Sequence, residues 1–83
     1  MRDAHIIKTP HQLKAVLRSL RRGRGLNQSE FGRKIGLSQE RISAIENHPE
    51  RLTTDQLLTI LMALGMELVI KPPSPETAPP GSW

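Results

Sequence analysis

Residues 26–47 constrain the fold of this chain more than any other stretch, and they read LNQSEFGRKIGLSQERISAIEN. Asn27 is a favourable N-cap, and Glu30 three residues later can complete a capping box, so we expect a helix to begin here. Gly36 suits the left-handed position that ends such a helix, and Ser38 can cap the next one. The stretch therefore predicts two short helices joined by a tight turn.

The second of these helices, the expected reading helix, is amphipathic in a way that suits the reading of DNA. Ile42 and Ile45 share its buried face, so small, amide and carboxylate side chains turn outward. Such side chains match the donors and acceptors of base edges in the major groove and permit close approach. The side chains that point away from the buried face are those of Gln39, Glu40, Ser43, Ala44 and Asn47. An ordinary helical hairpin is the alternative, but the glycine turn, the leading Gln39 and the surrounding positive charge favour a helix-turn-helix.

Positive charge is concentrated around these two helices. The chain carries a net charge of +4, but residues 14–41 alone hold eight Lys or Arg and two Glu, a local charge of +6. This predicts a salt-dependent attraction to DNA phosphates, although a basic surface of another purpose would fit the charge alone. The sequence has no cysteine, no signal-like leader and no apolar run of membrane-spanning length. We therefore expect a cytoplasmic protein without membrane contact.

The 83 residues divide into three segments by composition. We expect an N-terminal arm over residues 1–8, a helix-turn-helix DNA-binding and dimerisation domain over 9–71, and a flexible Pro-rich tail over 72–83. The tail ends in Trp83, the only tryptophan, which is either a cloning remnant or an anchor for a pocket on another protein.

Two further helices are expected to flank the central pair. Thr9 and Pro10 predict a helix over residues of about 10–22, with Gln12 closing its capping box. Pro49 predicts a loop after the reading helix, and Thr53 caps a last helix whose apolar surface is wider than one stripe. The fold class is thus a small all-α domain of four to five helices.

One strand is expected near the C-terminal end. Residues 66–71 are rich in β-branched side chains and are bounded by Gly65 and a Pro-Pro pair. Because one strand cannot satisfy its own backbone groups, it most simply pairs with the same strand of a second copy. The pairing residues would be Glu67, Leu68, Val69 and Ile70. The alternative is an extended segment that lies on its own core.

The stretch LNQSEFGRKIGLSQERISAIEN resembles the Xre/Cro/cI-type helix-turn-helix family. The flanking segments IIKTPHQL and ENHPERLTTDQLLTILMALGMELVI, with the short tail ending in Trp, resemble HipB-type antitoxins. This resemblance implies a lambda-repressor-like homodimer that binds palindromic operator DNA and neutralises a HipA-type serine/threonine kinase toxin. It also implies an intermolecular sheet of C-terminal strands and a tail whose Trp83 engages the kinase.

The resemblance also implies roles for individual residues, and it places Gln39, Glu40, Ser43 and Ala44 at the base-reading positions. Gln39 would hold adenine through two hydrogen bonds, while Glu40 would accept from cytosine or repel a phosphate. Arg21 and Glu46 match a partly buried ion pair that ties the first helix to the reading helix. The residues expected on the DNA backbone are Gln28, Lys34, Ser38, Arg41 and Asn47.

Signatures of catalysis and metal binding are missing from the sequence. The three histidines show no metal-ligand spacing, and there is no phosphate-binding glycine loop or nucleophile elbow. We therefore expect a protein without catalytic residues, metal, cofactor or small-molecule substrate. Two other functions stay open: a free-standing Xre/Cro-like repressor without a toxin, and a kinase-inhibiting interaction protein whose DNA binding is secondary.

Overall fold

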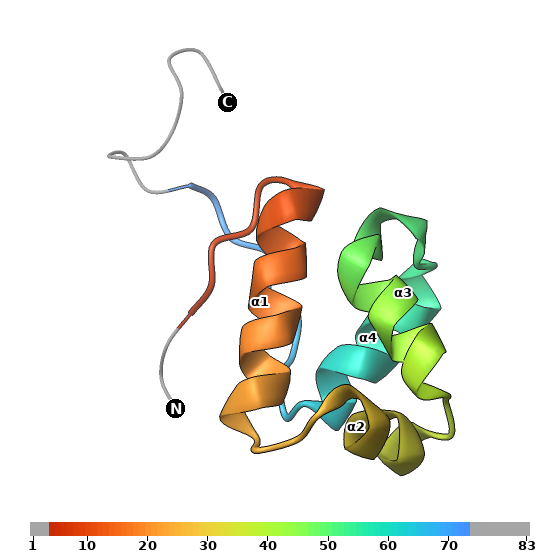
Figure 1. The fold of residues 1–83 in the computed structure, drawn as a ribbon. Coiled ribbons are helices and arrows are strands. Elements are labelled where there is room, and N and C mark those ends of the chain that lie inside the picture. Colours follow the sequence, from red (N-terminus) through yellow and green to blue (C-terminus); the bar gives the residue numbers. More distant parts are fainter. Residues whose placement is uncertain (1–3, 74–83) are drawn as a thin grey trace.

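A computed structural model describes residues 4–73, and within them the chain forms four α-helices around a single core (Figure 1). The elements are α1 (Pro10–Gly23), α2 (Gln28–Ile35), α3 (Gln39–Asn47), the 3₁₀ helix η1 (Pro49–Arg51) and α4 (Thr54–Ala63). The expectation of a small all-helical helix-turn-helix domain is confirmed. The loop expected after α3 instead contains η1, because Pro49 occupies the first position of a helical turn, where its missing N–H costs nothing.

Side-chain caps start the helices where the sequence predicts them. Asn27 with Glu30, and Thr53 with Gln56, form complete capping boxes. Ser38 accepts a hydrogen bond from the backbone N–H of Arg41. The box expected at α1 differs, because the Gln12 side chain accepts from the N–H of Lys8 rather than of Thr9.

The core lies between α1, the α2–α3 pair and α4. Its buried side chains are Leu17, Phe31, Ile42, Ile45, Ile60, Leu61 and Leu64. Ile42 is fully buried, so α3 is held by its inner face while its outer face stays in solvent. Fixing one face of the reading helix in this way sets the direction of every side chain on the other.

Two glycines permit the close turn between α2 and α3. Gly36 has φ 77°, the left-handed conformation that glycine adopts without steric cost. At Gly32 a Cβ atom would lie 2.4 Å from the carbonyl oxygen of Leu37. The backbones approach so closely because Leu37 N–H donates to the Gly32 carbonyl at 2.7 Å.

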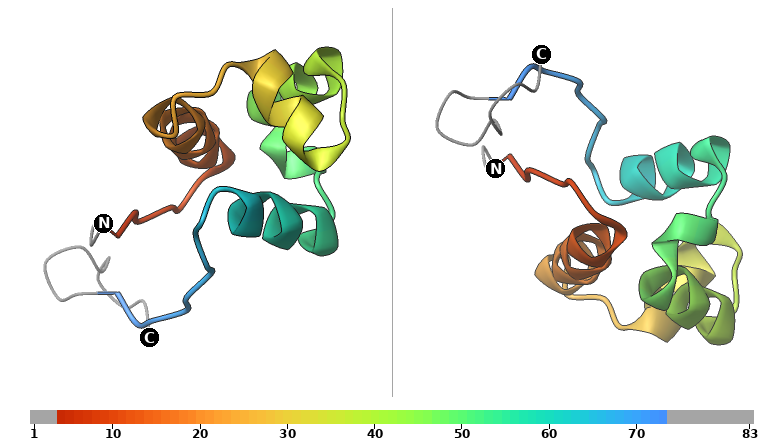
Figure 2. Two further views of the ribbon diagram at one scale, coloured as in Figure 1. Left: turned by 90° about the horizontal axis from the view of Figure 1, so that it is seen from below. Right: turned by 90° about the horizontal axis from the view of Figure 1, so that it is seen from above.

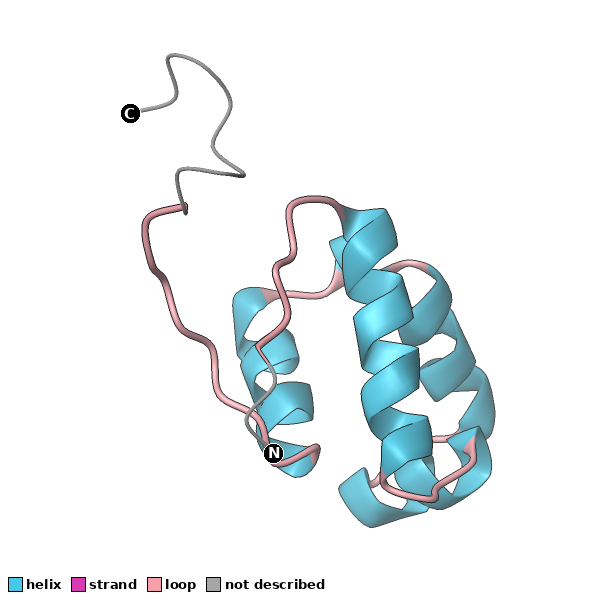
Figure 3. Cartoon of the chain, turned by 90° about the vertical axis from the view of Figure 1, so that its left-hand side faces the viewer, coloured by secondary structure: helices cyan, strands magenta, loops and turns pink. Residues whose placement is uncertain are grey.

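The described ends of the chain, residues 4–9 and 66–73, leave the helices on the same side (Figure 2). Residues 66–73 follow α4 as a loop, and no strand forms there in the single chain (Figure 3). Met66 still packs against the core, but Leu68 is 56%, Val69 69% and Ile70 93% exposed, so the residues after Met66 do not pack on it. Pairing with a second copy stays a prediction. Within residues 4–73, none of the helices combines the length and apolar character needed to cross a bilayer.

Candidate nucleic-acid interface

The outer face of α3 carries the side chains expected to read bases. Gln39, Glu40 and Ala44 are exposed and Ser43 is half-buried, opposite the buried Ile42 of the same helix. These four side chains are short or end in amide and carboxylate groups, so they match base edges without steric obstruction.

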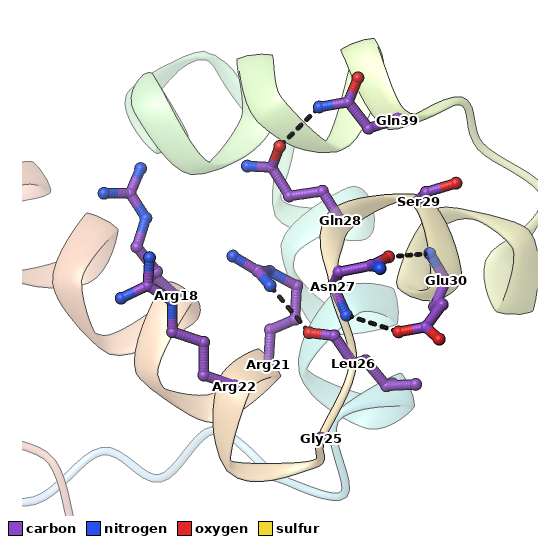
Figure 4. Close-up of a pocket in the computed structure, with 10 residues that line it drawn as sticks. All are labelled: Arg18, Arg21, Arg22, Gly25, Leu26, Asn27, Gln28, Ser29, Glu30 and Gln39. Carbon is purple, nitrogen blue, oxygen red and sulfur yellow. Dashed lines mark hydrogen bonds between the residues drawn. The ribbon is translucent and has the colours of Figure 1, made fainter.

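A broad groove of about 810 Å³ runs beside the start of α3 (Figure 4). It lies between the C-terminal half of α1 and the N-terminus of α2. Its polar lining residues are Arg18, Arg21, Arg22, Asn27, Gln28, Ser29, Glu30 and Gln39. Arginine side chains and the free N–H groups of a helix N-terminus both favour anions, so the groove suits a phosphate of the DNA backbone.

Three side chains connect the reading helix to the interior. The Nε2 amide group of Gln39 donates to Oε1 of Gln28 at 2.7 Å. The Nε2 group of Gln28 in turn donates to Oε1 of Glu46 at 3.1 Å. This amide relay, Gln39–Gln28–Glu46, joins the first residue of α3 to a carboxylate near the end of the same helix (Figure 4 shows its outer bond).

Glu46 and Arg21, the pair implied by the resemblance, form a buried ion pair. Glu46 is 3% exposed and Arg21 is 6% exposed. Nε and Nη2 of Arg21 both donate to the carboxylate, and Nη1 donates to the backbone oxygen of Leu26 at 2.8 Å. Burial opposes ionisation of Glu46, but the hydrogen bonds from Arg21 and Gln28 and the nearby arginine charges outweigh it and hold the pKa below its ordinary value of 4.5.

Arg18 extends this polar cluster to the far end of α3. Its Nη2 group donates to Oδ1 of Asn47 at 3.3 Å, and its Nε group lies 3.6 Å from Oε1 of Glu46. Asn47 donates to the hydroxyl of Ser43 at 3.4 Å. A chain of contacts therefore links α1 to two polar positions of the reading helix.

The residues expected on the DNA backbone do not all gather in one place. Gln28 lines the groove. Asn47 does not line it but accepts a hydrogen bond from Arg18, which does. Arg41 instead lines a smaller groove of about 230 Å³ between α3 and α4, on the other flank of the reading helix. Ser38 and Lys34 are exposed, and the Ser38 hydroxyl is engaged as the cap of α3.

Of the polar groove residues, the sequence assigns only Gln28 and Gln39 to DNA, and it gives no individual role to Arg18, Arg22 or Ser29. The spacing of Arg18 and Arg22 on α1 places both on one helical face, which was a usable signal. What the spacing does not reveal is that this face turns towards the start of α2.

No three His, Asp or Glu side chains of residues 4–73 come together as a metal site would require.

Comparison with known proteins places these features in a family. The sequence pattern of the helix-turn-helix family matches residues 17–71. The chain is 35% identical over 74 residues to antitoxin HipB of Escherichia coli strain K12, which covers 86% of this chain and 84% of that protein. It is also 35% identical over 75 residues to antitoxin HipB of E. coli O6:H1 strain CFT073, covering 87% and 80%.

Solved structures of HipB bound to 20-mers share the fold. The HipB–O4 20-mer complex superposes with a TM-score of 0.73 at 31% identity, covering 86% of this chain and all of that one. A complex of a HipB variant with an O2 20-mer gives a TM-score of 0.75 at 29% identity, covering 87% of this chain and all of the other. On sequence and structure together, this chain belongs to the HipB antitoxins of the helix-turn-helix family.

Proposed function

We propose that this protein is a double-stranded DNA-binding repressor that serves as the antitoxin of a toxin–antitoxin pair. The observation that carries the proposal is the exposed polar face of α3 beside an arginine-lined groove. The relatives' names support both parts, since they are antitoxins and their structures hold 20-mers. This favours an antitoxin over a free-standing repressor, and DNA binding as a primary function rather than a secondary one.

Base reading is assigned to the outer face of α3. Gln39 accepts from adenine N6 and donates to N7, while Ser43 and Ala44 allow the helix to approach the base edges. Glu40 accepts from cytosine N4 or, where a phosphate is near, disfavours that register by repulsion. These contacts supply sequence preference.

Contacts to the sugar-phosphate backbone supply affinity and register. Gln28 and Asn47 act there with the groove arginines Arg18 and Arg22. Ser38 and Lys34 are assigned to the same backbone, and Arg41 to phosphates on the opposite flank of α3. Because these are mostly charge contacts, the affinity falls steeply with salt.

A homodimer completes the DNA site. The exposed residues 67–70 are proposed to pair with the same residues of a second copy, which covers the apolar side chains of Leu68, Val69 and Ile70. The folded and dimerising unit is residues 9–71, with 1–8 as an arm. The twofold axis places two reading helices about 34 Å apart, one turn of the double helix.

A methylation footprint tests this arrangement. A duplex selected by the protein from a randomised pool should show two protected patches of guanine N7, related by a twofold axis and about 10 base pairs or a multiple apart. Guanine N7 lies in the major groove, so its protection reports the reading helix.

The matched variant Val69→Pro removes a ladder N–H at an exposed position and should abolish the paired pattern. One unpaired patch in the wild-type protein, or protection confined to the minor groove, would contradict the proposal.

The partner of the antitoxin is proposed to be a HipA-type serine/threonine kinase, held in part by the tail. Trp83 lies outside the described residues, and its role rests on the family resemblance and on the weight of tryptophan in protein interfaces. The protein itself is proposed to act in the cytoplasm as a non-enzyme.

Deletion of residues 72–83 should leave DNA binding unchanged and weaken the kinase complex. Loss of one anchoring tryptophan costs at least about 2 kcal/mol, or roughly thirtyfold in Kd. Calorimetric titration of the HipA-type partner kinase with full-length and shortened protein measures this, with Trp83→Ala as the single-residue control. Equal affinity of the full-length, shortened and Trp83→Ala proteins for the kinase would show that the tail is not part of the interface.

A further inference from the structure

We propose that the buried carboxylate of Glu46 determines the orientation in which Gln39 presents its amide to DNA. Glu46 acts through Gln28 and touches no base, so it is a positioning residue for sequence preference. The inference rests on the proposed function, because it requires that Gln39 reads a base.

Hydrogen-bonding chemistry fixes the direction of the amide relay at its inner end. An ionised carboxylate only accepts hydrogen bonds, whereas a glutamine amide can turn either its oxygen or its nitrogen towards a neighbour. Glu46 is ionised, since its pKa lies below the ordinary value. The group of Gln28 that faces Glu46 must therefore be the Nε2 donor, which agrees with the 3.1 Å hydrogen bond from Nε2 of Gln28 to Oε1 of Glu46.

The orientation of Gln28 in turn fixes the outer bond of the relay. With Nε2 of Gln28 turned inward, Oε1 of Gln28 faces Gln39 and accepts from it at 2.7 Å. Nε2 of Gln39 is thereby fixed on the Gln28 side of its amide. The second N–H and the oxygen of Gln39 then stand at the outer edge in one defined order.

That order matters because adenine also presents a donor and an acceptor in a fixed order, N6 and N7. When the amide is correctly turned, each group of Gln39 meets its complement. When it is reversed, oxygen faces N7 and N–H faces N6, so both contacts become repulsive. Glu46 thus contributes to base choice although it is buried beneath the interface.

A competing explanation is that Glu46 only neutralises Arg21 and holds α1 against α3. That role predicts effects on folding and on overall affinity, with no effect on the preference at one base position. The test therefore measures base preference.

The experiment uses the full chain and a pool of DNA duplexes of 20 base pairs, the length bound by the related proteins. Sequencing of bound and free duplexes gives the relative affinity for each base at each position. The position read by Gln39 is identified as the one whose preference is lost in Gln39→Ala.

The decisive variant is Gln28→Lys. A lysine ammonium only donates, so it can pair with Glu46 but forces Gln39 to turn its oxygen inward. The preference at the Gln39 position should fall by at least about fivefold, the lower end of a bidentate contact. Gln28→Met, which imposes neither orientation, should lower it by about twofold, since half of the population stays correctly turned.

Glu46→Gln should also lower this preference by about twofold, because an amide at residue 46 permits both orientations of Gln28. In the Gln28→Met background the same substitution should have no further effect on the preference. If Glu46→Gln does not fold, the double substitution Arg21→Met with Glu46→Gln, which buries no lone charge, takes its place.

Arg21→Lys is the matched control. It weakens the ion pair but keeps the carboxylate ionised, so stability should fall while the base preference is retained. An unchanged preference in both Gln28→Lys and Glu46→Gln, or an equal loss in Arg21→Lys, would overturn the inference. Failure of the proposed function looks different: the wild-type protein would then select no sequence, or Gln39→Ala would alter no position.

Discussion

Replacement of Glu46 by alanine is expected to lower the free energy of unfolding by about 3–5 kcal/mol. The substitution leaves the guanidinium of Arg21 buried without its carboxylate, and Arg21 is only 6% exposed. The remaining bond from Arg21 to the Leu26 carbonyl does not compensate a buried charge. A small domain of about 5–15 kcal/mol total stability would become marginal. Urea unfolding followed by far-ultraviolet circular dichroism measures the difference.

The double substitution Arg21→Met with Glu46→Gln provides the control. Replacing both charges by groups of similar size is often close to neutral, so the double variant should be clearly more stable than Glu46→Ala. If Glu46→Ala unfolds at the same urea concentration as the wild-type protein, the pair is not a buried constraint on the fold.

The same ion pair makes stability depend on pH in a defined direction. The folded-state pKa of Glu46 is lowered, chiefly because hydrogen bonds and charge from Arg21 outweigh the effect of burial. Its contribution is therefore complete above the ordinary value of 4.5 and is lost as the pH falls through the lower folded-state value. In the double variant Arg21→Met with Glu46→Gln, which lacks both charges of the pair, this part of the acid dependence should disappear.

The sequence predicts the elements of this fold well because their signals are local. Asn27 and Glu30, or Thr53 and Gln56, are three residues apart, and a capping box needs nothing more distant. The turn at Gly36 is equally local, since only the conformation of one residue is required. The sequence does not predict η1, because Pro49 signals an end to α3 but does not determine whether a loop or a helical turn follows.

The candidate site is less predictable, because it is built from contacts between distant residues. The Arg18–Asn47 bond spans 29 positions and the Arg21–Glu46 pair spans 25. Only the family resemblance implies the second. The amide relay depends on how α2 and α3 cross, and the position of Arg41 on the second groove depends on α4. Helical periodicity describes one helix at a time and contains neither relation.

The outer face of α3 is the surface proposed to read the DNA, and two of its residues are suited to a selective test. Removing the amide of Gln39 and the hydroxyl of Ser43 deletes the proposed base contacts without touching the core, since Ile42 and Ile45 hold the other face. Lost base contacts cost about 1–3 kcal/mol each. The groove arginines are unchanged, so binding to unrelated DNA should persist.

The measurement is a gel-shift titration of Gln39→Ala with Ser43→Ala against a duplex selected by the wild-type protein and against an unrelated duplex, at fixed salt. Ser19→Ala, an exposed serine of α1 that does not line the groove, is the matched control. The account predicts at least about tenfold weaker binding of the selected duplex by the double variant, with binding of the unrelated duplex, dimer mass and the Ser19→Ala protein all unaltered. Equal affinity of the double variant and the wild-type protein for the selected duplex would show that α3 does not read the DNA.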